Sequence, residues 1–287
     1  MNIEDFQDLK YEKEENGICT ITINQPERRN AMSFLTFLEI YTALEDIEKD
    51  KNAKLLILTG SEEGNAFSSG GYFNVKYLST ISQETRDEMD LMDIAQKKLA
   101  MKFWDFPKPV ITAINGLAVG AGITMPLFGS DLIYMAEDAW LGFYFVKRAI
   151  VPEFAMSYIL PFLIGFQKAK EILYFGDKIT APQAEKLGIV NKIMPKDELI
   201  PYVRSVAEKL IPPKGPTVSI KLMKKIMHDH FRDIFARTLD LENIGNQAGF
   251  KSADFREATI SLGEKRDPLF TGKENKIIRD IFKKPFD

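Results

Sequence analysis

Residues Pro107–Pro126 read PKPVITAINGLAVGAGITMP, and the interpretation of the whole chain starts from them. The segment Pro109–Ile114 is β-branched and bounded by prolines, which predicts a short buried strand. Asn115-Gly116 interrupts this strand. Gly120-Ala121-Gly122 and the apolar run Ile123–Phe128 then predict the start of a helix that enters the core.

The backbone N–H groups at this helix start lack intrahelical partners, and together with the helix dipole they attract negative charge. An enzyme that builds an oxyanion could use such a place. A dinucleotide-binding GxGxxG motif is excluded because Met125 occupies its last glycine position. A phosphate-binding P-loop is excluded because no Gly-Lys-Ser/Thr triplet follows. On these residues alone, the segment could also be an ordinary strand-to-helix connection with no catalytic role.

The composition is that of an ordinary globular protein. The 287 residues are 45% hydrophobic and 28% charged, which is enough for one large domain or one domain with a helical appendage. The net charge of −3 and pI of about 5.7 give no support for binding nucleic acid or an anionic membrane. The acidic start Met1–Lys13 resembles neither a signal nor a transit peptide, and no apolar run approaches a membrane span.

The single cysteine and the two histidines restrict the chemistry. Cys19 alone cannot form an internal disulfide, fits a reducing compartment such as the cytoplasm, and is expected to be a small core residue. His228 and His230 lie in the basic stretch Lys221–Arg232 and are predicted to be at a solvated helix end. We expect no metal site, since no third ligand is near them, and no Ser-His-Asp or Cys-His mechanism.

Strands alternate with helices along most of the chain, which predicts an α/β fold. A hairpin is expected around Asn16-Gly17, and a helix capped by Ser33 is expected to follow it. The remaining predicted strands are Lys54–Thr59, Asp131–Met135, Ala139–Phe143 and Ile189–Ile193. The predicted helices are Phe34–Asp50, Tyr77–Phe106, Phe154–Ile164, Gln167–Tyr174 and a short one capped by Thr180. From Asp197 the pattern is helical, so a core over residues 1–196 and a helical layer over 197–287 are expected.

Four stretches in this order and spacing resemble the crotonase (enoyl-CoA hydratase/isomerase) superfamily. They are Asn24–Met32, Leu58–Gly71, Lys108–Gly122 and Ile179–Lys192, and the tail Glu264–Phe270 is also similar. Each motif is weak alone, but together they cover nearly the whole chain. The resemblance implies a repeated ββα core with a C-terminal helical layer that forms a trimer or a dimer of trimers. It also implies a coenzyme A thioester of fatty acid metabolism as substrate, with no separate cofactor.

By the same resemblance, the N–H groups of Gly71 and Ala121 would bind the thioester oxygen of an enolate-like anion. Alanine at 121 replaces the more usual glycine, but the donor is the backbone N–H. The residues implied along the acyl-CoA path are Ser69, Gly71, Tyr72, Phe73, Asn74 and Thr124. Arg28 and Arg29 could meet the CoA phosphates, because a guanidinium suits phosphate geometry, or they could be solvated loop arginines.

The sequence departs from the best-known hydratases of this family, which use two glutamates. Those positions fall at Thr124 and near Phe145, and one extra residue between Thr124 and Asp131 shifts the alignment there. Glu153 is a different candidate. Some relatives, including peroxisomal-type Δ3,Δ2-enoyl-CoA isomerases, carry their essential glutamate at this place, and aromatic-CoA dehalogenases carry a nucleophilic aspartate. Apolar neighbours should raise the pKa of Glu153 and suit it to moving a proton, unless it merely stabilises a helix N-terminus.

One carboxylate is enough for isomerisation, so an isomerase is favoured chemically. Hydration by one carboxylate would need help from Thr124, Tyr72 or Tyr144. Attack by Glu153 on the acyl group, an inactive scaffold and RNA binding are further alternatives, the last disfavoured by the acidic balance. The aromatic residues that could wall an acyl pocket, or pack as ordinary core, are Phe143, Tyr144, Phe145, Phe154 and Tyr158.

Overall fold

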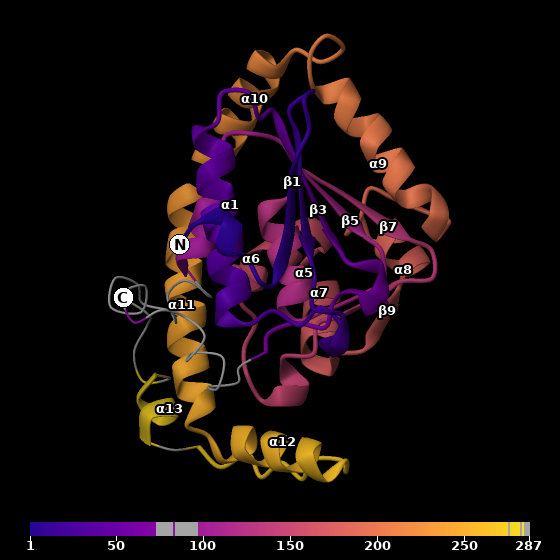
Figure 1. The fold of residues 1–287 in the computed structure, drawn as a ribbon. Helices are drawn as coiled ribbons and strands as arrows, with labels where there is room; N and C mark the ends of the chain where they lie inside the picture. The colour runs from indigo at the N-terminus through magenta and orange to yellow at the C-terminus, as the bar shows by residue number, and fades with distance from the viewer. Residues whose placement is uncertain (73–82, 84–96, 275, 282, 284–287) are drawn as a thin grey trace.

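The computed structural model describes residues 1–72, 83, 97–274, 276–281 and 283 (Figure 1). Two predicted substrate-binding residues, Phe73 and Asn74, lie outside these ranges. So does most of the predicted helix Tyr77–Phe106, of which Leu99–Asp105 is described as helix α4.

A six-stranded sheet forms the centre of the fold. Its strands, in the order β1-β2-β3-β5-β7-β10, are Leu9–Lys13, Ile18–Ile23, Leu55–Gly60, Val110–Ile114, Leu132–Ala136 and Lys192–Met194. The hairpin β1-β2 is antiparallel as predicted, and the other neighbours run parallel. The predicted strand Ile189–Ile193 is shifted, because Ile189 and Val190 belong to the turn that follows a short helix.

A second sheet has four strands and contacts the first through β4. Its order is β4-β6-β8-β9, with strands Ala66–Ser68, Leu117–Val119, Trp140–Gly142 and Lys178–Thr180. The chain alternates between the two sheets, so β5-β6 followed by helix α5 (Ala121–Gly129) is one ββα unit. The repeated ββα arrangement is therefore present. Strands β4, β6 and β9 were not among the predicted strands, since three residues are too few to show a hydrophobic period.

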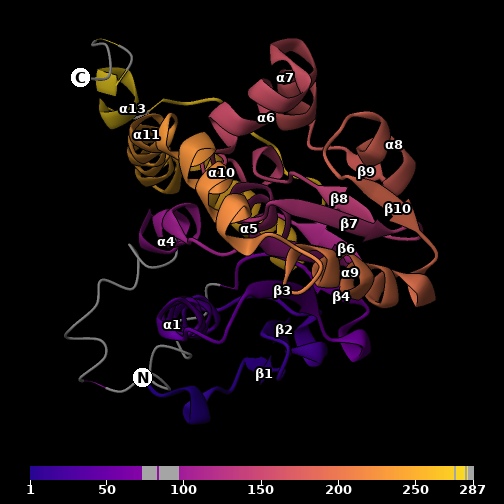
Figure 2. The same ribbon diagram turned by 90° about the horizontal axis from the view of Figure 1, so that it is seen from above.

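Helices cover both faces of the first sheet (Figure 2). Helix α1 (Phe34–Lys49) packs on β1 and β2, and α4 contacts both α1 and α5. Helix α9 (Lys196–Leu210) covers the other face at β3, β5 and β7. At the edge lie α6 (Met156–Ile164), α7 (Phe166–Phe175) and α8 (Ala181–Lys186). The capping boxes at Ser33 and Thr180 confirm the two predicted helix starts.

Of the C-terminal helices, α10 and α11 follow one side of this core, and α12 lies across its lower end (Figure 1). They are α10 (Thr217–Asp229), α11 (Arg232–Phe250), α12 (Ala253–Glu264) and α13 (Lys276–Ile281). Helix α11 contacts α6. In the part of the chain that the structure describes, none of the helices has the length and apolar character needed to cross a membrane.

His228 at the end of α10 is not solvated as predicted. Its ring stacks on Trp104 of α4 at 3.9 Å between centroids, and its Nδ1 donates to the Trp104 carbonyl oxygen at 2.8 Å. The prediction was wrong because α10 packs against α4, which the basic sequence around His228 does not reveal. His230, two residues on, is exposed as expected.

Candidate active site

Two short backbone segments meet where β4 and β6 end. The strands pair in parallel, so Ser68–Tyr72 and Val119–Gly122 leave the sheet next to each other. A Cβ atom on Gly70, whose φ is +100°, would lie 2.6 Å from the Val119 carbonyl oxygen and 3.8 Å from the Ala121 nitrogen. A Cβ atom on Gly122 would lie 2.4 Å from the Ser68 carbonyl oxygen. This close backbone contact requires glycine at both positions.

The two predicted oxyanion donors lie on these segments. Ala121 is the first residue of α5, where an N–H has no intrahelical acceptor, and the preceding Gly120 has no side chain to cap it. Gly71 follows Gly70 on the other segment. Among the described residues, neither of the two N–H groups donates to a protein acceptor. The two N–H groups therefore lie on adjacent backbone segments, and their joint binding of an anion stays a prediction.

The loop before α1 holds the Gly71 segment in place. Ser69 N–H donates to the Arg29 carbonyl oxygen at 3.0 Å, and Tyr72 N–H donates to that of Met32 at 2.7 Å. Met32 N–H in turn donates to the Gly70 carbonyl oxygen at 2.8 Å. The first Gly-rich segment thus has its backbone fixed from two sides, by this loop and by the segment that starts α5.

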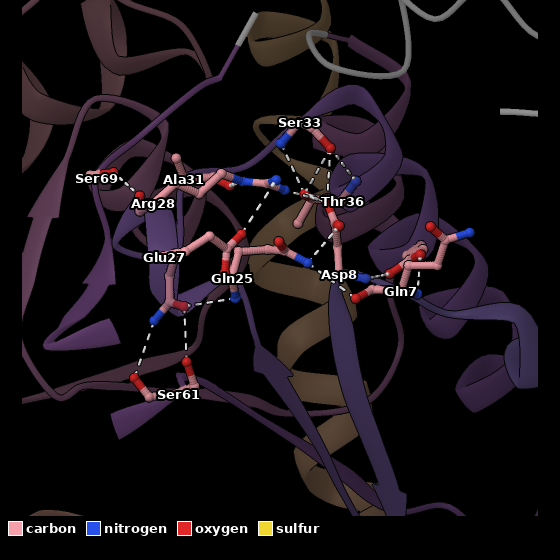
Figure 3. Close-up of polar contacts among 12 residues, drawn as sticks. Gln7, Asp8, Gln25, Glu27, Arg28, Ala31, Ser33, Thr36, Ser61 and Ser69 are labelled. Carbon is pink, nitrogen blue, oxygen red and sulfur yellow. Dashed lines mark hydrogen bonds and ion pairs between the residues drawn. The ribbon is translucent and has the colours of Figure 1, made fainter. Parts of the chain in front are cut away.

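The Arg28 side chain makes polar contacts within the same region (Figure 3). Its guanidinium bonds Asp8 at 2.9 Å and the Ala31 carbonyl oxygen at 3.0 Å, and its side chain is 11% exposed. It also lies 5.2 Å from the centre of the Tyr72 ring. These contacts tie Arg28 to the scaffold of the site. Its binding of CoA phosphates stays a prediction.

Buried Asp8 is the centre of this network. It accepts hydrogen bonds from Gln25 at 2.7 Å, from the Ser33 hydroxyl at 2.8 Å, from Thr36 and from Arg28 (Figure 3). Asp8→Ala would remove the buried counter-charge of the Arg28 guanidinium, and the remaining Glu27 carboxylate is exposed and 3.8 Å away, so we expect the free energy of unfolding to fall by about 3–5 kcal/mol. Urea denaturation measures this. Asp5→Ala, at an exposed position nearby, is the matched control and should change it by less than about 0.5 kcal/mol. Equal changes in the free energy of unfolding in Asp8→Ala and Asp5→Ala would show that the contacts of Asp8 add little to stability.

Glu153 lies in the loop between β8 and α6. Phe154 and Ala155 adopt φ values of +54° and +55°, so α6 starts at Met156 and not at Phe154 as predicted. The apolar sequence did not reveal this left-handed turn. Glu153 consequently precedes the helix by three residues and does not lie in its first turn. The Phe154 ring packs edge-on against Phe128 of α5 at 6.3 Å, and α5 contacts α6, which brings the Glu153 loop against the helix that starts at Ala121.

The environment of Glu153 favours its protonated form. Burial, together with a smaller contribution from the carboxylate of Glu242, raises the pKa of its carboxyl group to about 8. A carboxyl group with a pKa near neutrality can both accept and return a proton. Glu153 therefore has the acid–base property that a proton carrier needs, and its catalytic role stays a prediction.

The other candidate positions supply no carboxylate. Thr124 is buried, and its hydroxyl donates to the Gly120 carbonyl oxygen at 3.2 Å. Phe145 is buried and apolar, and Phe143 and Phe154 are fully buried as core residues. Tyr144 packs beside Trp140 at 6.0 Å and under the Lys147 ammonium at 4.5 Å.

Two residues of α11 that contact the Glu153 loop, Glu242 and Asn246, were missed from the sequence. Both are buried, and they continue the stripe of Phe235 and Leu239 along one face of α11. Spacings of four, three and four residues are those of a buried helix face, so polar residues there could have indicated a buried contact. Their target, more than 80 residues earlier, could not be inferred from this pattern.

Comparison with known proteins finds the same architecture and sequence features elsewhere. Residues 13–273 match a family profile described as enoyl-CoA hydratase/isomerase. The chain is 30% identical to the crotonyl-CoA hydratase of Syntrophomonas wolfei, over 93% of this chain and 99% of that one. It is 32% identical to mouse peroxisomal enoyl-CoA delta isomerase 3, over 74% of this chain and 65% of that one. A crystal structure of enoyl-CoA hydratase/isomerase from Pseudoalteromonas atlantica superposes with a TM-score of 0.81 at 24% identity, covering 92% of this chain and all of that one.

Proposed function

Since the chain belongs to the enoyl-CoA hydratase/isomerase family, we propose that it moves the double bond of a 3-enoyl-CoA to the 2 position, with Glu153 carrying the proton. The observation that carries this proposal is the chemistry of the site residues. One carboxyl group with a raised pKa lies in the loop next to α5, whereas Thr124 and Phe145, the positions where the family resemblance puts the two hydratase glutamates, carry no carboxylate. A shift of a proton from C2 to C4 needs one base that removes the proton and then gives it back at the other carbon.

In the proposed reaction, ionised Glu153 removes a proton from C2 of the substrate. The electron pair moves onto the thioester oxygen, which accepts hydrogen bonds from the N–H groups of Gly71 and Ala121. Preorganised donors of this kind contribute about 2.7–4 kcal/mol each to the stability of such an anion. Glu153 then returns the proton to C4, and the enolate collapses to the 2-enoyl thioester. Atoms and charge balance without a cofactor, since coenzyme A is part of the substrate.

Hydration of a 2-enoyl-CoA is the second candidate, supported by the 30% identical relative named crotonyl-CoA hydratase. It needs an activated water and a proton delivered elsewhere on the substrate. The Thr124 hydroxyl already donates to a backbone carbonyl, and Tyr144 is packed against Trp140. These contacts favour isomerisation over hydration.

We also propose that the chain acts as a homo-oligomer, a trimer or a dimer of trimers, in the cytoplasm and in fatty acid metabolism. The support for self-association is a stripe of exposed apolar side chains on one face of α10. These are Val218, Leu222, Met223, Ile226 and Met227. An apolar stripe of this length favours a protein contact over solvent.

The direct test gives the purified protein a 3-enoyl-CoA and, separately, a 2-enoyl-CoA, and resolves the products by chromatography across pH. We expect the 3-enoyl substrate to be converted. Because only ionised Glu153 can accept the C2 proton, kcat/KM should rise with pH and level off above about pH 8. Water addition to the 2-enoyl substrate without isomerisation would favour the hydratase. No turnover of either would contradict both activities.

A further inference from the structure

The loop that carries Glu153 is held by a helix that is distant in the sequence. Buried Glu242 of α11 accepts hydrogen bonds from Ala155 N–H at 2.8 Å and from Ser157 N–H at 2.9 Å. It also accepts the Ser157 hydroxyl at 2.6 Å. Both of its carboxylate oxygens are therefore used, and all three donors belong to the first residues of α6 or the turn before them.

These contacts replace a local helix cap. Ala155 occupies the N-cap position of α6 and has no side chain that could accept from the first N–H groups. Helices normally satisfy these groups with a nearby Ser, Thr, Asp or Asn. Here a carboxylate from α11 does so, and its charge is favourable at the positive end of the helix.

The same contacts fix an unusual backbone. Phe154 and Ala155 are two consecutive non-glycine residues in the left-handed region. Such conformations persist only where the surroundings impose them, and they often occur at functional sites. This turn directly follows Glu153, so it sets the direction in which the Glu153 side chain leaves the backbone.

One turn further along α11, Asn246 anchors the other side of the loop. Its side-chain oxygen accepts from Val151 N–H at 3.1 Å. Between the two anchors, a Cβ atom on Gly245 would lie 3.0 Å from Val151, so the helix backbone approaches the loop closely. Glu153 therefore lies between two backbone points, 151 and 155, that are both fastened to α11.

We propose that Glu242 is a positioning residue for Glu153. It holds the left-handed turn at 154–155 from α11, and when ionised it adds a negative charge near the Glu153 carboxyl group. This inference rests on the proposed proton-carrying role of Glu153. It adds that α11, a helix of the C-terminal layer, determines how the base is aimed and how readily it ionises.

The negative charge of Glu242 has a predictable effect on the pKa of Glu153. Three donors stabilise ionised Glu242, whereas burial raises the pKa of its carboxyl group to about 7. When Glu242 is ionised, it opposes the ionisation of Glu153. Removing the charge should therefore lower the pKa of Glu153, and removing a hydrogen bond without a charge should not.

Glu242→Gln tests this directly. It keeps one oxygen for Ser157 but removes the charge and sets an N–H₂ group against Ala155 N–H. We expect kcat for the 3-enoyl-CoA to fall by about 10²-fold at similar KM, because a base misplaced by about 1 Å loses this much. The pH at which kcat/KM levels off should also fall. Glu242→Asp keeps the charge but is one methylene too short, so it should lower kcat and leave that pH near the wild-type value.

Two further variants distinguish the effect of α11 on the position of Glu153 from its effect on the pKa of Glu153. Asn246→Ala removes the other anchor without a charge, so kcat should fall with the pH profile unshifted. Asp240→Asn removes an exposed acidic charge from the same helix, paired with Lys97, and should change neither quantity. The proposal is overturned if Glu242→Gln or Glu242→Asp lowers only the melting temperature, with kcat and pH profile as in the wild type.

An infrared titration makes the outcome independent of the reaction. The carboxyl stretch of protonated Glu153, identified by its loss in Glu153→Gln, reports the pKa of Glu153 in each variant. A wild type that does not isomerise 3-enoyl-CoA would contradict the proposed function, yet the expected fall of this pKa in Glu242→Gln would still support the contact. An unchanged pKa there would contradict the inference whatever the wild type catalyses.

Discussion

Glu153→Gln is expected to lower kcat for the conversion of 3-enoyl-CoA by about 10³-fold. Glutamine has nearly the same shape, so the loop between Val151 and Ala155 should keep its anchors to α11. It cannot accept the C2 proton, however, and positioned general bases typically contribute about 10²–10⁴-fold. Steady-state kinetics with chromatographic detection of the 2-enoyl product measures the effect.

The control for this variant is Glu137→Gln, which makes the same change at an exposed turn and should leave kcat unaltered. Exchange of the C2 hydrogen with D₂O should fall together with isomerisation. If Glu153→Gln is as active as the wild type, Glu153 is not the base. A trapped covalent acyl adduct on Glu153 would instead indicate nucleophilic attack, the hydrolase or dehalogenase chemistry.

Gly122→Ala should lower kcat by about 10²–10³-fold, the loss typical of removing one oxyanion donor. Gly122 lies in the first turn of α5, and its added Cβ atom would meet the Ser68 carbonyl oxygen at 2.4 Å and the Ser68 Cβ atom at 3.0 Å. One of these is backbone, so the clash cannot be relieved by rotating a side chain. The segment that ends in Gly71 must move away from Ala121, which separates the two N–H donors.

Gly263→Ala is the matched control, because a Cβ atom there, on helix α12, meets nothing within 4 Å. It should leave kcat and melting temperature unchanged or slightly raise the latter, since alanine favours helix. For Gly122→Ala, circular dichroism at the assay temperature must show a folded protein. A folded Gly122→Ala with wild-type kcat would mean that the spacing of the two donors does not limit catalysis.

The sequence alone determined the features that depend on neighbours along the chain. The Asn16-Gly17 turn predicted the β1-β2 hairpin, and Ser33 predicted the start of α1, because turn and cap chemistry act over a few residues. The run Pro109–Ile114 predicted β5, and Gly120-Ala121-Gly122 predicted a helix start with free N–H groups. The motifs in order predicted the family, which the comparisons confirm.

Other features were decided by contacts between distant segments. Strands β4, β6 and β9 span three residues each and exist because they pair with one another and with β8, not because of their own pattern. Arg28 could be read as a solvated loop residue or a phosphate ligand, whereas its pairing with Asp8, 20 residues earlier, is visible only in the fold. The sequence predicted a solvated His228, whereas in the fold its ring stacks on Trp104 because α10 packs against α4.

The Glu153 site shows this division most clearly. The sequence indicated a carboxyl group among apolar residues and hence a raised pKa. It did not indicate the left-handed turn at Phe154 and Ala155, because non-glycine residues adopt that conformation only when tertiary contacts impose it. Those contacts come from Glu242, which lies 87 positions after Ala155. The chemical type of a residue is known from the sequence. The direction of its side chain and the electrostatic environment around it depend on the distant segments that the fold packs against it.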